Sequence, residues 1–209
     1  VKKAQVIKLK DGETFTLIAS IVKQKIGNRV IRRYAYNGTI PGPIIEVSKG
    51  SSVKIKFINQ TDSDQTLHSH GLRLDYRYDG AVGLGQKKPV KPGETFTYEL
   101  KFPDTGVFWY HPHVREDYSQ DMGLYGNYFV KETKGNIEPF NKQIPLVLDD
   151  ILLEKNAQPF YKDFANYAAM GRFGNIMLIN GVPDFTTEIN KGDIVRFYLT
   201  NTANTRTFN

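Results

Sequence analysis

The sequence predicts an all-β protein with the architecture of a β-sandwich. Its apolar residues occur in short continuous or alternating runs, and Gly, Pro, Asn and Asp separate these runs. This pattern is typical of sandwiches and barrels. Lys162–Met170 is the only stretch that favours a short helix. A residue pattern also occurs twice along the chain, which indicates one complete sandwich followed by the first part of a second.

Nine strands are expected in the first part of the chain, in the runs between turn residues. Lys49-Gly50 and Lys91–Glu94 (KPGE) are typical of turns that lead into strands. In chain order, the expected strands are Gln5–Leu9, Thr14–Val22, Val30–Tyr36, Ile44–Val47, Ser52–Asn59, Thr66–Gly71, Thr95–Lys101, Gly106–His113 and Gly126–Glu132.

A boundary between two domains is expected near residue 140. The stretch Lys134–Lys142 is polar and contains Gly and Pro, which is typical of a linker. A new strand pattern follows at Ile144–Leu148. We therefore expect a first domain at residues 1–140 and a partial second domain at residues 141–209.

The internal repeat characterises this second domain. The pattern Glu-Val-x-Lys-Gly-x-x-Val-Lys-x-x-Phe-x-Asn of Glu46–Asn59 recurs with conservative changes at Glu188–Asn201, and Asn-Gly precedes both copies. The first copy leads to His68, whereas the second leads to Asn209 and has no histidine at the matching position. A half sandwich would expose sheet edges. We therefore expect this chain to be the N-terminal piece of a longer protein.

The composition limits the classes to which the chain can belong. Its 209 residues can hold one large domain, or one domain and part of another, and its 13 Phe and 12 Tyr predict an aromatic core. No apolar run reaches the length of a membrane span, and the net charge of +6 is spread along the chain. We therefore expect no membrane span and no nucleic-acid partner. The absence of Cys excludes disulfides, zinc–thiolate sites and a blue-copper site made by this chain alone.

All histidines of the chain fall into two His-x-His pairs, one at His68 and His70 and the other at His111 and His113. Side chains at positions i and i+2 of a strand leave the same face, so each pair presents two imidazoles side by side. Imidazole without thiolate suits Cu, Zn, Fe or Ni. The two pairs therefore predict a metal site.

Several further motifs accompany the histidine pairs. The whole set is Tyr36–Pro43 (YNGTIPGP), His68–Leu72 (HSHGL), Asp79-Gly80, Pro92-Gly93, Gly106–His113 (GVFWYHPH), Gln120 and Gly123–Gly126 (GLYG). In this combination the chain resembles the multicopper oxidases, a family that includes laccases and metallo-oxidases. The resemblance covers residues 1–132 and, more loosely, residues 144–209. It implies cupredoxin-like Greek-key sandwiches for both parts.

The resemblance also implies a role for each histidine. Proteins of the family carry one type 1 copper and a trinuclear cluster, whose ligands are four His-x-His pairs from the first and last domains. His68 would bind the type 2 copper of this cluster. His70 and His111 would share one type 3 copper, and His113 would bind the other. Asp79 matches the aspartate that the family places near the type 2 copper, where a carboxylate offsets charge and delivers protons.

The function implied by the resemblance is that of an oxidase. It would couple one-electron oxidation of a reducing substrate to the four-electron reduction of dioxygen to water. Its partners would be dioxygen, a reducing substrate that the sequence does not identify, and the remainder of the oxidase, which would hold the type 1 copper. The family favours a periplasmic or extracellular location. Because this chain would supply half of the cluster ligands, we expect it to be inactive alone.

Two alternative functions remain open. A copper nitrite reductase would carry a Cys-containing type 1 site in its first domain, where this chain has His111 and His113 without Cys. A non-catalytic copper-binding cupredoxin module is the other alternative, although the intact histidine pairs favour the oxidase.

Residues beside the second histidine pair are expected to have structural roles. Trp109 and Tyr110 should line the core, because they belong to a strand rich in aromatic residues. Glu116 and Asp117 are expected to lie in a solvated loop. Met122 is expected to pack in the interior.

Overall fold

The structure is a computed structural model that describes residues 4–132, 140–155, 157–158 and 164–209. The chain divides into two compact units, which comprise Val1–Lys23 with Arg32–Lys134 and Gln24–Ile31 with Gly135–Asn209. Residues 134–139 of the expected linker lie outside the described residues.

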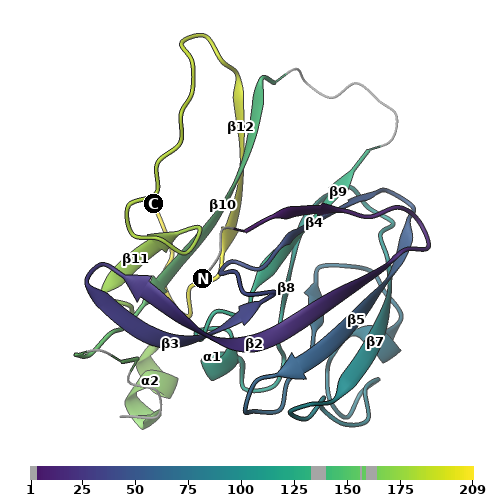
Figure 1. The fold of residues 1–209 in the computed structure, drawn as a ribbon, viewed down its shortest axis with the longest axis horizontal. Helices are drawn as coiled ribbons and strands as arrows, with labels where there is room; N and C mark the ends of the chain where they lie inside the picture. Colours follow the sequence, from purple (N-terminus) through teal and green to yellow (C-terminus); the bar gives the residue numbers. More distant parts are fainter. Residues whose placement is uncertain (1–3, 133–139, 156, 159–163) are drawn as a thin grey trace. The chain divides into compact units, whose positions relative to one another are not determined.

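Three sheets in the described part of the chain confirm the predicted all-β class (Figure 1). The nine strands expected in the first part are all present, with ends shifted by a few residues. One strand of the second part, Ile176–Ile179, was not predicted. The strands are β1 (Val6–Lys8), β2 (Thr14–Ile26), β3 (Arg29–Tyr36), β4 (Ile44–Ser48), β5 (Ser52–Gln60), β6 (His68–His70), β7 (Thr95–Lys101), β8 (Gly106–His111), β9 (Gly126–Lys131), β10 (Lys142–Ile151), β11 (Ile176–Ile179) and β12 (Val195–Asn201).

The expectation of a single helix was wrong, because two further short helices occur among the described residues. They are the 3-10 helix η1 (Tyr76–Tyr78) and α1 (Glu116–Ser119), whereas α2 (Phe164–Met170) lies within the predicted helix. Lys162 and Asp163 of that prediction lie outside the described residues. A helix of one turn has no repeat of apolar positions, so periodicity does not reveal it.

Two sheets belong to the first unit. Residues 24–31, which include the turn between β2 and β3, are assigned to the second unit. One sheet has the order β1-β4-β9-β8-β6 and the other β3-β2-β5-β7. Aromatic side chains pack between them: the ring of Tyr36 in β3 lies 5.3 Å from that of Tyr110 in β8, and both are fully buried. A Cβ atom on Gly126 would lie 2.3 Å from the Tyr110 ring, so only glycine permits this packing. The predicted aromatic core is confirmed.

The second unit repeats part of the sheet β3-β2-β5-β7. Its own sheet has the order β11-β10-β12, and β10 is parallel to β12 as β2 is parallel to β5. Asn37 and Asn180 of the repeated Asn-Gly both have a left-handed backbone, with φ of 50° and 51°. Their side chains accept hydrogen bonds from the amides of Ile18 at 2.7 Å and Val147 at 2.9 Å. The sequence repeat is therefore also a structural repeat, although Glu188 lies outside any strand.

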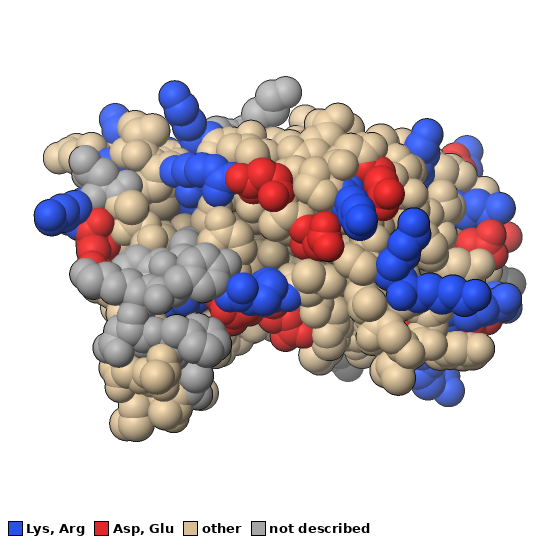
Figure 2. All heavy atoms as spheres, turned by 90° about the horizontal axis from the view of Figure 1, so that it is seen from below, with Lys and Arg blue, Asp and Glu red and all other residues tan. Residues whose placement is uncertain are grey.

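The surface is polar and mixed in charge. Figure 2 shows one face, on which Lys and Arg side chains lie among Asp and Glu side chains. Oppositely charged side chains also pair among the described residues, as Arg73 does with Asp104 at 2.8 Å. Within the described ranges, no helix has the length and apolar character that a membrane crossing requires.

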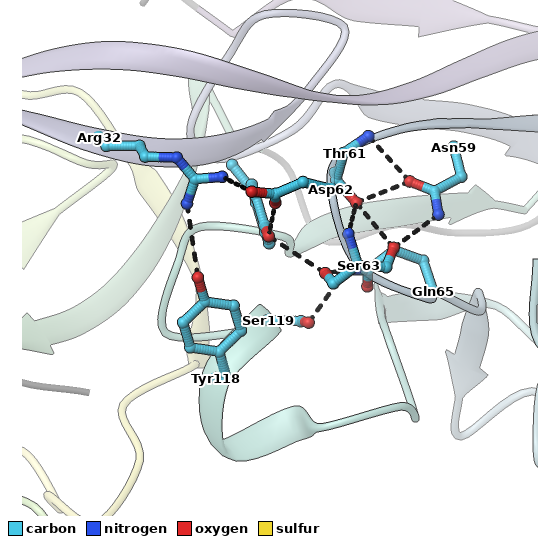
Figure 3. Close-up of polar contacts among 9 residues, drawn as sticks. Arg32, Asn59, Thr61, Asp62, Ser63, Gln65, Tyr118 and Ser119 are labelled. Atoms are coloured by element: carbon cyan, nitrogen blue, oxygen red, sulfur yellow. Dashed lines mark hydrogen bonds and ion pairs between the residues drawn. The ribbon is translucent and has the colours of Figure 1, made fainter. Parts of the chain in front are cut away.

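A polar network fixes the loop between β5 and β6, which leads to the first histidine pair (Figure 3). Asp62 accepts hydrogen bonds from the guanidinium of Arg32 at 2.6 Å and from the hydroxyl of Tyr34. Gln65 is fully buried, and its amide nitrogen donates to the hydroxyl of Ser119 in α1 at 3.1 Å. The loop is therefore tied to β3 on one side and to α1 on the other.

Replacing Asp62 with Asn should destabilise the chain in a pH-dependent way. The hydrogen bond from Tyr34, together with Arg32, holds the pKa of the Asp62 carboxyl below its ordinary value. The resulting stabilisation is complete above the ordinary pKa of about 3.9 and is lost as the pH falls through the lower folded-state value. Because the Asp62 side chain is 59% exposed, the difference at neutral pH should stay below about 1 kcal/mol.

Urea unfolding of wild type and Asp62→Asn at a series of pH values measures this difference. Asp64→Asn is the matched control, because the described structure gives the Asp64 carboxylate no hydrogen bond. A stability difference for Asp62→Asn that stayed constant down to about pH 2 would contradict the linkage argument.

Candidate metal centre

Three of the four histidines lie on neighbouring strands, as the sequence predicts, and His113 follows the end of the second strand. β6 is antiparallel to β8, and the register places His68 opposite His111 and His70 opposite Trp109. Opposite residues and alternate residues of paired strands face the same side. The side chains of His68, His70 and His111 therefore share one face of the sheet. β8 ends at His111 rather than at the expected His113, because the intervening proline has no amide hydrogen to continue the ladder.

Tyrosine hydroxyls hold the opposite, buried face of β6. The amide of Leu67 donates to the hydroxyl of Tyr98 at 2.9 Å. Ser69, between the two histidines, is buried, and its hydroxyl lies 3.1 Å from that of Tyr128. The core thus fixes the residues on either side of His68, and the imidazoles are directed to the other face.

The four imidazoles form one group. The ring centroid of His68 lies 5.4 Å from that of His70, 5.2 Å from that of His111 and 4.5 Å from that of His113. One ring nitrogen each of His68, His70 and His111 lie within 4.8 Å of one another, so this trio could hold a metal ion. His113 lies beside the trio, next to His68.

Backbone carbonyls determine which nitrogen two of these rings present. The Nδ1 atom of His68 lies 2.8 Å from the carbonyl oxygen of Asp79, and that of His111 lies 2.9 Å from the carbonyl oxygen of Pro112. A carbonyl oxygen only accepts hydrogen bonds, so Nδ1 carries the hydrogen in both rings. Nε2 of His68 and of His111 is therefore free to bind a metal ion.

Burial keeps the same two imidazoles neutral. Burial, aided by the neighbouring imidazoles and opposed by the hydrogen bond to the Pro112 carbonyl, lowers the pKa of His111 to about 3. The pKa of His68 is also lowered, again chiefly by burial. Metal ions bind the neutral ring, so protons compete less with a metal ion here than at an exposed histidine.

Asp79 meets His68 through both its backbone and its side chain. Its carbonyl accepts the 2.8 Å hydrogen bond from Nδ1, and its carboxylate oxygen lies 3.4 Å from the same nitrogen. Gly80 permits this approach, because its φ is +79° and a Cβ atom would lie 2.3 Å from the carbonyl oxygen of Leu67. The Asp-Gly turn therefore packs directly on the strand that carries the first histidine pair.

Trp109 lies in the site, and the expectation that it lines the core was wrong. Its ring stacks on His111, with centroids 4.1 Å apart at 23°, and lies 5.1 Å from His70. Tyr110, on the other face of β8, is fully buried as expected. Trp109 and His111 are two residues apart on one strand, so strand alternation already places both side chains on the same face.

Glu116 also lies in the site, although its sequence neighbourhood predicted a solvated loop. It is the first residue of α1, and its carboxylate oxygen lies 2.8 Å from Nδ1 of His113. The amide of His113 donates to the hydroxyl of Thr66 at 3.0 Å. His113 and Glu116 are three residues apart, and such side chains meet only if the chain turns between them. The sequence did not reveal this turn.

Known proteins resemble this chain over most of its length. The family model described as multicopper oxidase matches residues 22–135. The multicopper oxidase mco of Staphylococcus epidermidis is 30% identical over 194 residues, which are 87% of this chain and 40% of that protein. A crystal structure of a multi-copper oxidase from Pseudomonas thermotolerans is 31% identical, with a TM-score of 0.84, over 94% of this chain and 47% of that chain.

A third relative has a similar extent of overlap. A multicopper oxidase from Campylobacter jejuni, described as a metallo-oxidase, is 27% identical with a TM-score of 0.71 and covers 87% of this chain and 40% of that chain. The chain therefore spans less than half the length of each of these three relatives. The family match includes more than half of the chain and both histidine pairs. Together with the gathering of the imidazoles into one group, this match shows that the chain belongs to the multicopper oxidase family.

Proposed function

We propose that this chain supplies half of the histidine ligands of a trinuclear copper cluster, in an oxidase that reduces dioxygen to water. A reducing substrate would give up its electrons one at a time, and phenols, metal ions and other donors all remain open. The chain has no Cys and spans 40% of its staphylococcal relative, so the type 1 copper would lie in another part of the oxidase. The proposal includes a periplasmic or extracellular location, which cell fractionation tests.

The donor set fits copper. It consists of imidazole nitrogens without thiolate, which copper accepts readily. Nδ1 of His70 lies 3.3 Å from Nε2 of His111. This separation matches the edge of a tetrahedron whose metal–nitrogen bonds are about 2.0 Å long. The spacing supports the proposal that His70 and His111 share one type 3 copper.

The remaining two histidines would serve the other two copper ions. We assign His68 to the type 2 copper and His113 to the second type 3 copper. Their rings stand edge-on to each other at 88°, with centroids 4.5 Å apart, and Nε2 of His68 is free. Two rings so close together can bind adjacent ions without rearrangement of the strands.

The residues around the histidines would hold the ligands in place. When bound, copper supplies the one-electron chemistry by which dioxygen is reduced. Tyr98 contacts the backbone amide of Leu67, Tyr128 contacts the hydroxyl of Ser69, and Trp109 packs on the ring of His111. Asp79 places a negative charge beside His68, where it would offset the charge of the cluster and help to move protons.

The observation that carries the proposal is the gathering of both His-x-His pairs inside the residues that match the family. A non-catalytic copper-binding module would present the same imidazoles. Such a module would bind a full complement of copper without any further chain, whereas half of a cluster would not.

Replacing His70 or His111 with Ala in the complete oxidase should abolish dioxygen reduction and leave the blue absorbance of the type 1 copper nearly unchanged. Each change removes one of two nitrogens that lie 3.3 Å apart, whereas the type 1 site would lie elsewhere. Oxygen uptake and visible absorption are measured beside Tyr76→Ala, a control at a side chain that is 67% exposed. Loss of the blue band in a folded His variant would show that the ligand assignment is wrong.

Replacing Asp79 with Asn should slow oxygen turnover while most of the copper is retained. The Asp79 carbonyl still accepts the hydrogen bond from His68 in this variant, but the negative charge 3.4 Å from the ring is lost. Copper content and steady-state turnover are compared with those of Asp64→Asn, which removes a carboxylate from the loop before β6. Turnover equal to that of wild type would leave Asp79 with the role of a turn residue alone.

The 209-residue chain by itself should show no sustained oxygen uptake and should bind Cu(II) weakly and substoichiometrically. It presents one trio of imidazoles with a fourth beside it, and no thiolate. An oxygen electrode with a phenolic donor, corrected for the uptake that the same concentration of free Cu(II) gives, and a calorimetric Cu(II) titration check both expectations. Sustained four-electron turnover by the monomeric chain would overturn the half-cluster proposal, and tight stoichiometric binding without turnover would favour the copper-binding module.

A further inference from the structure

The imidazoles differ in the group that contacts their second nitrogen. Nδ1 of His68 and of His111 donates to a backbone carbonyl. Nδ1 of His113 instead faces the carboxylate of Glu116 at 2.8 Å. A carboxylate is charged and therefore accepts a hydrogen bond more strongly than a carbonyl does.

One segment of the chain anchors both partners of this contact. The hydroxyl of Thr66 accepts the amide hydrogen of His113, which fixes the backbone at the ring. The adjacent residue, Gln65, is fully buried and donates to Ser119 at the end of α1 (Figure 3). Arg115 has a left-handed backbone with φ of 49°, which turns the chain so that α1 starts three residues after His113.

The contact between His113 and Glu116 differs from an ordinary surface ion pair in its surroundings. The side chains of His113 and Glu116 are 38% and 44% exposed, and a pair of that exposure contributes little to folding. Here the backbone on both sides is anchored, and the ring that Glu116 contacts lies 4.5 Å from that of His68. A carboxylate at this distance from Nδ1 can act on the direction and the tautomer of the imidazole.

We propose that Glu116 is a positioning residue for His113: its carboxylate accepts the hydrogen of Nδ1 and so holds the ring in the tautomer that leaves Nε2 free for copper. This inference rests on the proposed copper-binding function, because it assigns Glu116 a role toward the same site. Carboxylate partners orient metal-binding imidazoles and raise their basicity, and losing such a partner costs about 10–100-fold in metal affinity or activity.

The tautomer can be measured without copper. The complete oxidase is prepared metal-free with ¹⁵N in its histidines, and spectra are recorded at about pH 8, where unperturbed imidazoles are neutral. The signals of His113 are those that disappear in His113→Gln. Wild type should show His113 as a single tautomer with the hydrogen on Nδ1. Glu116→Gln, which keeps the size of the side chain, and Glu116→Ala should both shift it toward a mixture, whereas the neighbouring control Asp117→Asn should not.

Copper affinity gives the second measurement. Glu116→Gln should lower the affinity of the histidine group for copper about tenfold and leave the blue absorbance of the type 1 copper unchanged. An unchanged tautomer in both Glu116 variants, or a hydrogen on Nε2 in wild type, would overturn the inference, even if copper affinity fell. If the tautomer shifts as expected but the histidine group of the wild-type oxidase binds no copper, the contact is upheld and the proposed function fails.

Discussion

The register between β6 and β8 is the constraint on which the candidate site depends. Three residues of β6 pair with β8, and this pairing places His68 opposite His111. A slip of one residue would turn the imidazoles of β6 into the core and bring Ser69 to the solvent face. The tyrosine hydroxyls that contact Leu67 and Ser69 oppose such a slip, because it would take the amide of Leu67 and the buried hydroxyl of Tyr128 away from these partners. The metal site therefore depends on the aromatic core as much as on the histidines.

The sheet that the internal repeat preserves is not the sheet that carries the histidines. β11-β10-β12 of the second unit corresponds to β3-β2-β5 of the first, with the same asparagine contact at Asn37 and Asn180. β6 and β8 belong to the other sheet of the first unit, which has no counterpart among the described residues of the second. Among the described residues, the repeated element is therefore the sheet that does not carry the imidazoles.

Strand alternation made most of the site predictable, because it is a local rule that needs only the sequence. It predicted the shared face of His68 and His70, and applied to Trp109 it would have placed that ring on the face of His111. Glu116 could not be found in this way, because its approach depends on the left-handed Arg115 and on one turn of helix without periodicity. The carbonyl of Asp79 reaches His68 through a close approach of two backbone segments, which a strand pattern does not encode.

The exposure of the His70 side chain affects which metal ions the imidazole trio can bind. For sites of nitrogen ligands, affinity rises along the first-row series through Ni²⁺ to Cu²⁺ and falls again at Zn²⁺. His70 is exposed, so one side of the imidazole trio is open to water, and the described part of the chain presents no coordination geometry that rejects Ni²⁺ or Zn²⁺. By intrinsic affinity alone, the imidazole trio of the described residues therefore favours Cu²⁺ over Ni²⁺ and Zn²⁺.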